Sequence, residues 1–159
     1  MRILFIFLIF ISTTVYSENP NKTVYTLFYF GASDCGYCVD SVNIARINKM
    51  RLELPRLRKD LSFKFVLVVM DTKIDEGIEF TKHYPNWNEL SIGSRYNNEL
   101  MMAHLNRSEI AGVPHVMLYK DNVQYDESNI PTIKKRTLLK DLVGQTKIKN
   151  WLNDGYPIK

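Results

Sequence analysis

The sequence predicts an α/β fold in which a central mixed sheet is flanked by helices. Two segments rich in β-branched and aromatic residues, 23–30 and 63–71, have the composition of buried strands. The segment between them has helical spacing of its apolar residues, so the three together predict a right-handed βαβ unit. A third apolar segment, 115–120, runs into a turn and a returning strand, which adds an antiparallel hairpin to the parallel pair.

The first βαβ unit is the clearest part of the pattern. Strand 23–30 is followed by helical spacing that begins at Cys35. The apolar face of this helix consists of Val39, Val42, Ile47, Met50 and Leu54. Pro55 breaks or kinks the helix, and a short helical piece continues to Leu61. The second strand is apolar at every position from 65 to 70, as expected for a strand that is covered on both faces.

The segment between the second and third strands is the least regular part of the chain. We expect residues 72–111 to form a helical insert, with a loop over 84–94 and a helix over 95–106. The insert comes directly before the strand that begins at 115.

The C-terminal part predicts one further strand and a closing helix. Residues 130–135 fit either a strand or a loop, whereas 136–144 predicts the last strand, ending at Gly144. Residues 146–154 have the spacing of an amphipathic helix. Its inner face consists of Ile148, Trp151 and Leu152.

The N-terminus has the pattern of a secretory signal peptide. Met1 and Arg2 give a positive start, residues 3–11 are all apolar, and a small polar stretch follows as far as Ser17. An N-terminal anchor is the less favoured alternative, because a spanning helix needs about 20 apolar residues. We therefore expect a signal peptide over 1–17 and one domain over 18–159, without stable membrane insertion after cleavage.

The charge pattern argues against a nucleic-acid partner. The chain has a formal net charge of +4, and its basic residues are scattered apart from small clusters at 51–59 and 134–136. Aromatic residues do not alternate with them, as they do on single-strand binding surfaces. These charges are interpreted as solvated surface.

Cys35 and Cys38 are the only two cysteines, and three interpretations compete for them. A disulfide across two residues closes a very short loop and is a poor structural cross-link. A structural zinc site needs four ligands, and the three histidines His83, His104 and His115 are not paired at helical spacing. The third interpretation is thiol chemistry, which the position of the pair favours.

The cysteines stand where a strand ends and a helix is expected to begin. At a helix N-terminus, free backbone N–H groups and the helix dipole favour an anion and lower the pKa of a thiol. Cys38 follows one turn later, within reach of a mixed disulfide at Cys35. We therefore expect Cys35 to be the nucleophile and Cys38 the resolving thiol.

The order of these features resembles the thioredoxin superfamily, in particular its secreted and periplasmic thiol–disulfide oxidoreductases. The resemblance rests on "CGYC" at 35–38 after a strand, on "AGVPHVMLY" at 111–119, and on "LVG" at 142–144 before a last helix. It implies a thioredoxin-like fold with a cis peptide bond between Val113 and Pro114. It also implies that the Val113–Pro114 loop faces Cys35 and pairs with the substrate backbone, and that an exposed Tyr37 contacts the substrate.

Three positions depart from the family pattern. Asp34 stands where cytoplasmic members have tryptophan, Tyr29 where they have a buried aspartate, and Leu67 where they have the accompanying lysine. Asp34 either points to water or caps the helix, which is the preferred interpretation, or it couples to Cys35 and raises its pKa. His115 either lies near the sulfurs or, as preferred, points away on the other face of its strand.

The expected function is disulfide exchange with partner proteins, in the periplasm or outside the cell, with no bound cofactor or metal. An upstream redox protein would supply or accept the electrons, and the reductant direction is slightly preferred. A disulfide-forming oxidant or an isomerase is an alternative. A metal-delivery or assembly factor that uses both thiols as ligands is an alternative of another class.

Overall fold

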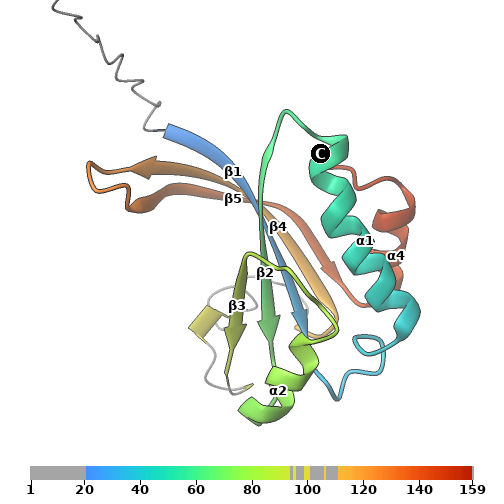
Figure 1. Cartoon of the computed structure of the whole chain (residues 1–159). Coiled ribbons are helices and arrows are strands. Elements are labelled where there is room, and N and C mark those ends of the chain that lie inside the picture. The colour runs from blue at the N-terminus through green and yellow to red at the C-terminus, as the bar shows by residue number, and fades with distance from the viewer. Residues whose placement is uncertain (1–20, 94, 96–98, 101–105, 107–110, 159) are drawn as a thin grey trace, which may run out of the picture.

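The computed structural model describes residues 21–93, 95, 99–100, 106 and 111–158 (Figure 1). The expected signal peptide lies outside these residues. None of the described helices is long and apolar enough to span a membrane.

A five-stranded mixed sheet forms the centre of the molecule. Its strands are β1 (Asn21–Gly31), β2 (Ser62–Val69), β3 (Glu89–Ile92), β4 (His115–Tyr125) and β5 (Pro131–Val143). The strand order is β3-β2-β1-β4-β5, in which β1, β2 and β3 are parallel and β4 and β5 pair antiparallel. The described helices are α1 (Ser41–Leu57), α2 (Ile74–Thr81) and α4 (Gln145–Asn153). The predicted α/β fold with a mixed sheet and flanking helices is confirmed.

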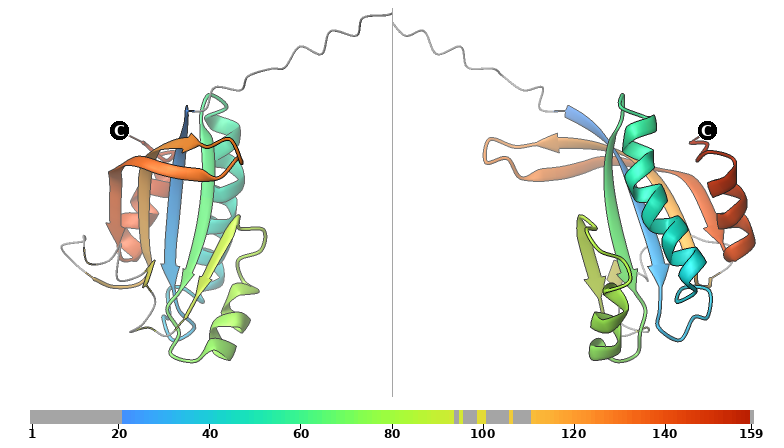
Figure 2. Two further views of the ribbon diagram at one scale, coloured as in Figure 1. Left: turned by 90° about the vertical axis from the view of Figure 1, so that its left-hand side faces the viewer. Right: turned by 45° about the vertical axis from the view of Figure 1, so that its right-hand side comes forward.

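The helices pack on one face of the sheet. Figures 1 and 2 show α1 and α4 side by side against the central strands, and α2 lies lower, beside β2 and β3. The core of this helix side includes Leu27, Tyr29, Met50, Phe80, Leu118, Ile148 and Trp151. Because side chains alternate along a strand, the neighbouring β1 residues Phe28 and Phe30 enter a second cluster on the opposite face. The strand β1 is therefore buried on both sides.

The opposite face carries a partly buried ion pair at the base of the β4–β5 hairpin. Arg136 donates to both oxygens of Asp121 at 2.7 Å, and Thr26 donates to the same carboxylate. The Arg136 guanidinium also lies over the rings of Phe28 and Tyr119, at 5.4 and 5.1 Å from their centroids. Beyond this point the hairpin projects from the body of the molecule (Figures 1 and 2).

Two sequence-based expectations about element boundaries are wrong. The expected loop over 84–94 contains β3, which adds a parallel edge strand to β2. Four residues with half-exposed side chains give too weak an alternation to be recognised. The first helix begins at Ser41 rather than at Cys35, because the Asp40 carboxylate accepts the Asn43 N–H at 2.9 Å and caps the helix there.

Other boundaries follow the prediction more closely. Pro55 lies within the last turn of α1, which ends at Leu57. The ambiguous residues 130–135 belong almost entirely to β5, and the closing helix is shifted by a single residue. The helix expected over 95–106 falls largely outside the described residues.

Gly31, the last residue of β1, provides a test of the packing. A Cβ at this position would lie 2.7 Å from Cζ of the buried Phe80, closer than carbon atoms pack. We expect Gly31→Ala to lower the free energy of unfolding by about 1–3 kcal/mol. Denaturant unfolding of the oxidised protein measures this.

The matched control is Gly36→Ala, where no described atom lies within 4 Å of the added carbon. This change should alter the unfolding free energy by less than about 0.5 kcal/mol. Equal destabilisation by the two substitutions would contradict the proposed contact with Phe80.

Candidate active site around Cys35 and Cys38

The two cysteines lie in a turn between β1 and α1 and differ in their exposure. They form a disulfide with a Cα–Cα distance of 5.2 Å. Cys38 is completely buried in the helix-side core, whereas Cys35 is partly exposed. Between them, Tyr37 is 54% exposed. An incoming thiol or disulfide can therefore reach Cys35, while Cys38 is shielded by the protein.

The local hydrogen bonds show which donors lie next to the Cys35 sulfur in the disulfide. The N–H of Cys38 donates to Cys35 Sγ at 3.2 Å, and the N–H groups of Cys38 and Val39 donate to the Cys35 carbonyl. The N-terminus of α1 does not contribute as expected, because the helix starts after Asp40, whose carboxylate already occupies its N-cap. The Cys35 sulfur thus accepts one backbone N–H, that of Cys38, and not the group of free N–H donors expected at a helix N-terminus.

The Val113–Pro114 loop lies at the same edge of the sheet as the cysteine turn. Its peptide bond is cis, in agreement with the expectation from the sequence. β4 begins directly afterwards with His115, which pairs with Phe30 near the end of β1. Val113 packs against the buried cluster that contains Cys38. Strand order, cysteine turn and cis-proline loop together decide the fold class.

The fold is thioredoxin-like.

Comparisons with known proteins give only distant matches. No family model and no curated protein matches the chain. Among solved structures, StoA from Bacillus subtilis is 20% identical, with 83% of this chain and 84% of that chain covered and a TM-score of 0.44. The thioredoxin domain of a thiol-disulfide oxidoreductase from Bacteroides vulgatus is 16% identical, with coverages of 84% and 79% and a TM-score of 0.44.

A third structure, of a putative thiol:disulfide interchange protein DsbE from Chlorobium tepidum, is 17% identical over 82% of this chain and 79% of that one, with a TM-score of 0.42. The fold assignment therefore rests on the topology and the turn geometry of this chain itself.

Asp34 is paired with an arginine from the insert. Arg95 Nη2 lies 2.7 and 2.5 Å from the two oxygens of Asp34, and Arg95 Nε donates to the Met70 carbonyl at 3.1 Å. The Asp34 side chain is 62% exposed, as expected for a residue that points to water, but it does not cap the helix. Its negative charge is compensated by a side chain that lies 61 positions away in the sequence.

Asp71 anchors the start of the same turn. This carboxylate is buried at the end of β2 and accepts the Ser33 N–H at 3.0 and 3.2 Å, together with the Ser33 hydroxyl. The chain is thereby fixed two residues before Cys35. The sequence placed Asp71 as the last residue of the predicted strand 63–71, but its partner could not be recognised from spacing.

Buried phenols occupy the position beneath Cys38. Tyr29 is completely buried, and its hydroxyl lies 3.1 Å from that of Tyr84. Tyr84 donates to the Cys38 carbonyl at 2.5 Å, while Asn43 Nδ2 donates to the Tyr37 carbonyl at 2.8 Å. Burial raises the pKa of Tyr29 to about 12, and burial raises the pKa of Tyr84 as well. Both phenols are therefore neutral at physiological pH.

Leu67 and His115 do not take part in this network. Leu67 is completely buried among apolar residues of the helix-side core. His115 Nε2 lies 2.5 Å from Asp141 Oδ1, and its ring lies 5.4 Å from that of Phe30, on the face opposite the helices. Burial lowers the pKa of His115, and Asp141 partly offsets this effect. His115 thus lies on the face opposite Cys38, as the preferred interpretation expected, whereas Cys35 packs against the clusters on both faces.

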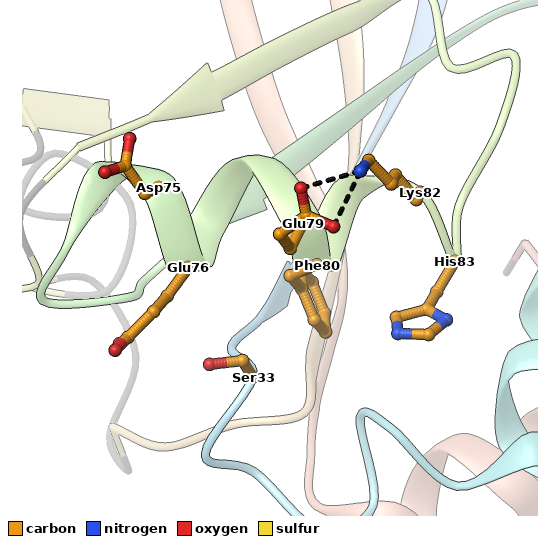
Figure 3. A pocket seen from close by; sticks show the side chains of 7 residues that line it. All are labelled: Ser33, Asp75, Glu76, Glu79, Phe80, Lys82 and His83. Carbon is orange, nitrogen blue, oxygen red and sulfur yellow. Dashed lines mark hydrogen bonds and ion pairs between the residues drawn. The ribbon is translucent and has the colours of Figure 1, made fainter.

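A hollow of about 450 Å³ adjoins the turn at Ser33. Figure 3 shows its lining along α2 and the residues that follow, with a salt bridge between Glu79 and Lys82. Its other lining residues are Asp75, Glu76, Phe80 and His83. No group of three or more His, Cys, Asp or Glu side chains in the described part of the chain is arranged to hold a metal ion.

The Asp34–Arg95 pair makes a prediction about the Cys35 thiol. Without the arginine, the Asp34 carboxylate next to Cys35 is uncompensated and disfavours the thiolate. Because charges at exposed sites interact weakly, Arg95→Gln should raise the Cys35 pKa by less than about 1. Asp34→Asn should lower it by a similar amount, and the double variant should lie near the wild type. The pH dependence of Cys35 alkylation in the reduced protein measures these values.

Arg58→Gln is the control, because Arg58 forms a comparable exposed pair with Asp60 at the far end of α1. It should leave the Cys35 pKa unchanged. If Arg95→Gln and the double variant shift the pKa equally, the arginine does not act through Asp34.

Proposed function

We propose that the protein is a thiol–disulfide oxidoreductase that exchanges disulfides with partner proteins through Cys35 and Cys38. The observation that carries this proposal is the unequal exposure of the two sulfurs at a turn that shares its sheet edge with a cis-proline loop. A structural cross-link would not need one accessible sulfur. A pair with one exposed and one shielded thiol suits a two-step exchange.

The proposed reaction has two exchange steps. The Cys35 thiolate attacks a disulfide of the partner protein, a Cys35–partner bond forms, and the first partner thiolate leaves. Cys38 loses its proton, which ends on the first partner thiolate, and attacks Cys35 Sγ. The Cys35–Cys38 disulfide forms, the second partner thiolate leaves, and the partner has gained two electrons. An upstream redox protein restores the two thiols.

We favour the reductant direction because the thiolate of Cys35 has limited stabilisation. Strongly oxidising pairs owe their potential to a stabilised reduced form. In this turn a single N–H, that of Cys38, donates to Cys35 Sγ, and α1 starts too late to add its N-terminus. The exposed Tyr37 and the Val113–Pro114 loop would contact the partner. The protein would act in the periplasm or outside the cell after removal of residues 1–17.

The first test of this proposal is trapping of the mixed disulfide. Cys38→Ser should accumulate a covalent complex with a disulfide-containing protein such as insulin, because no second thiol can release it. Cys35→Ser should accumulate none, because Cys38 is buried. Non-reducing electrophoresis and mass spectrometry detect the complex. Equal trapping by both variants would contradict the assignment of Cys35 as the nucleophile and Cys38 as the resolving thiol.

The reduction potential tests the direction of electron flow. We expect a value nearer to thioredoxin's, about −270 mV, than to the roughly −120 mV of a strong oxidant. Equilibration with glutathione or dithiothreitol buffers, followed by alkylation and mass spectrometry, measures it. Tight retention of copper or zinc by the reduced protein without any insulin reduction would instead favour a metal-delivery or assembly factor.

A further inference from the structure

We propose that Tyr84, from the insert, is a positioning residue for the resolving step: its hydroxyl holds the Cys38 carbonyl so that the Cys38 thiol is aligned for attack on Cys35. The inference rests on the proposed disulfide exchange and adds a residue that no sequence motif marks. Tyr84 follows α2 and lies 46 positions from Cys38 in the sequence.

The hydrogen bonds around Tyr84 can have only one direction. Tyr84 has one hydroxyl proton, which it donates to the Cys38 carbonyl at 2.5 Å. Tyr29 must therefore be the donor in the 3.1 Å contact between the two hydroxyls. Asn43 Nδ2 donates to the Tyr29 oxygen at 3.4 Å and to the Tyr37 carbonyl at 2.8 Å. The chain of donors runs from Asn43 through both phenols and ends on Cys38.

Packing fixes the Tyr84 ring in this position. The side chain is 1% exposed, and its ring centroid lies 5.2 Å from those of Tyr29 and Phe80 and 6.5 Å from that of Trp87. A hydroxyl on so constrained a ring has little freedom to move. Two successive carbonyls of the turn, those of Tyr37 and Cys38, are thus held by side chains from outside the turn.

This arrangement matters most after the Cys35–Cys38 bond has been broken. In the mixed disulfide the Cys35–Cys38 bond no longer holds the two sulfurs together. The position of Cys38 then depends on the backbone and its hydrogen bonds. Small errors in alignment slow intramolecular attack considerably. The network supplies position and not a base, because both phenols keep their protons at physiological pH. The phenols therefore do not take up the proton that Cys38 loses before it attacks.

The test separates the two steps with glutathione disulfide as the probe. Reduced protein is mixed with the probe, quenched with acid at short times and alkylated, and the glutathionylated species is followed by mass spectrometry. Tyr84→Phe keeps the ring and removes only the hydroxyl. We expect the loss of this buried hydrogen bond to slow resolution about tenfold, while formation of the mixed disulfide changes less than about twofold.

The pH profile tests whether Tyr84 acts as a base, and the comparison of the two steps tests whether its role is merely structural. The rate of resolution should rise with pH in both the wild type and Tyr84→Phe. The two curves should have the same shape, with lower rates for the variant at every pH. A curve of different shape in the variant would mean that the phenol takes part in proton transfer, and would overturn a pure positioning role. Equal slowing of both steps would show general loosening of the turn and would also overturn the proposal.

Tyr156→Phe is the matched control. Tyr156 donates a comparable hydrogen bond to Glu53, at 2.7 Å, in a contact that does not involve the cysteine turn. Its variant should resolve at the wild-type rate, and a tenfold slowing there would overturn the specific role of Tyr84. If the wild type forms no mixed disulfide at all, the proposed function itself fails. If the wild type turns over and Tyr84→Phe matches it, only the positioning role fails.

Discussion

The burial of β1 between β2 and β4 is the constraint on which the remaining structure depends. Its register brings Gly31 opposite Val69 on one side and Phe30 opposite His115 on the other. The ends of three chain segments therefore meet at one edge of the sheet: the cysteine turn, the segment after β2 and the cis-proline loop. A shift of one residue in either pairing would exchange the two faces of β1 and separate these groups.

Local patterns in the sequence were sufficient for the parts of the site that depend on chain continuity. Cys35 and Cys38 follow a strand whose apolar run is unambiguous, and Pro114 precedes another. The contacts that surround them are of a different kind. Asp34 meets Arg95, and Tyr84 meets both Tyr29 and Cys38, across 46 to 61 positions. Such pairs leave no periodicity, so only the folded chain reveals them.

The start of α1 shows how a local prediction can fail for a local reason. Apolar spacing from Cys35 onward suggested a continuous helix, with Asp34 as a candidate for its cap. The structure uses Asp40, whose carboxylate accepts the Asn43 N–H, and leaves the cysteines in a separate turn. Asp34 is then free to pair with Arg95. Because Asp40 caps the helix, the Asp34 carboxylate next to Cys35 is left to pair with Arg95 of the insert.

Neutral phenols beneath Cys38 also change how folding responds to pH. A carboxyl buried there would have a raised pKa, and the stability it contributes when protonated would be lost as pH rose above its ordinary value near 4. Tyr29 has its pKa raised from 10.0 to about 12, so the same loss occurs only as pH rises from about 10 towards 12. At physiological pH this position therefore costs no ionisation penalty.

The carbonyl of Cys38 is consequently fixed by a hydrogen bond. The two phenols beneath Cys38 are uncharged. The proposed exchange would then depend on geometry at the buried sulfur and on charge balance at the exposed one. The insert supplies a residue to each: Tyr84 to the carbonyl of Cys38 and Arg95 to the acid beside Cys35. A segment without any recognisable motif thus contacts the Cys38 carbonyl directly and the acid that precedes Cys35.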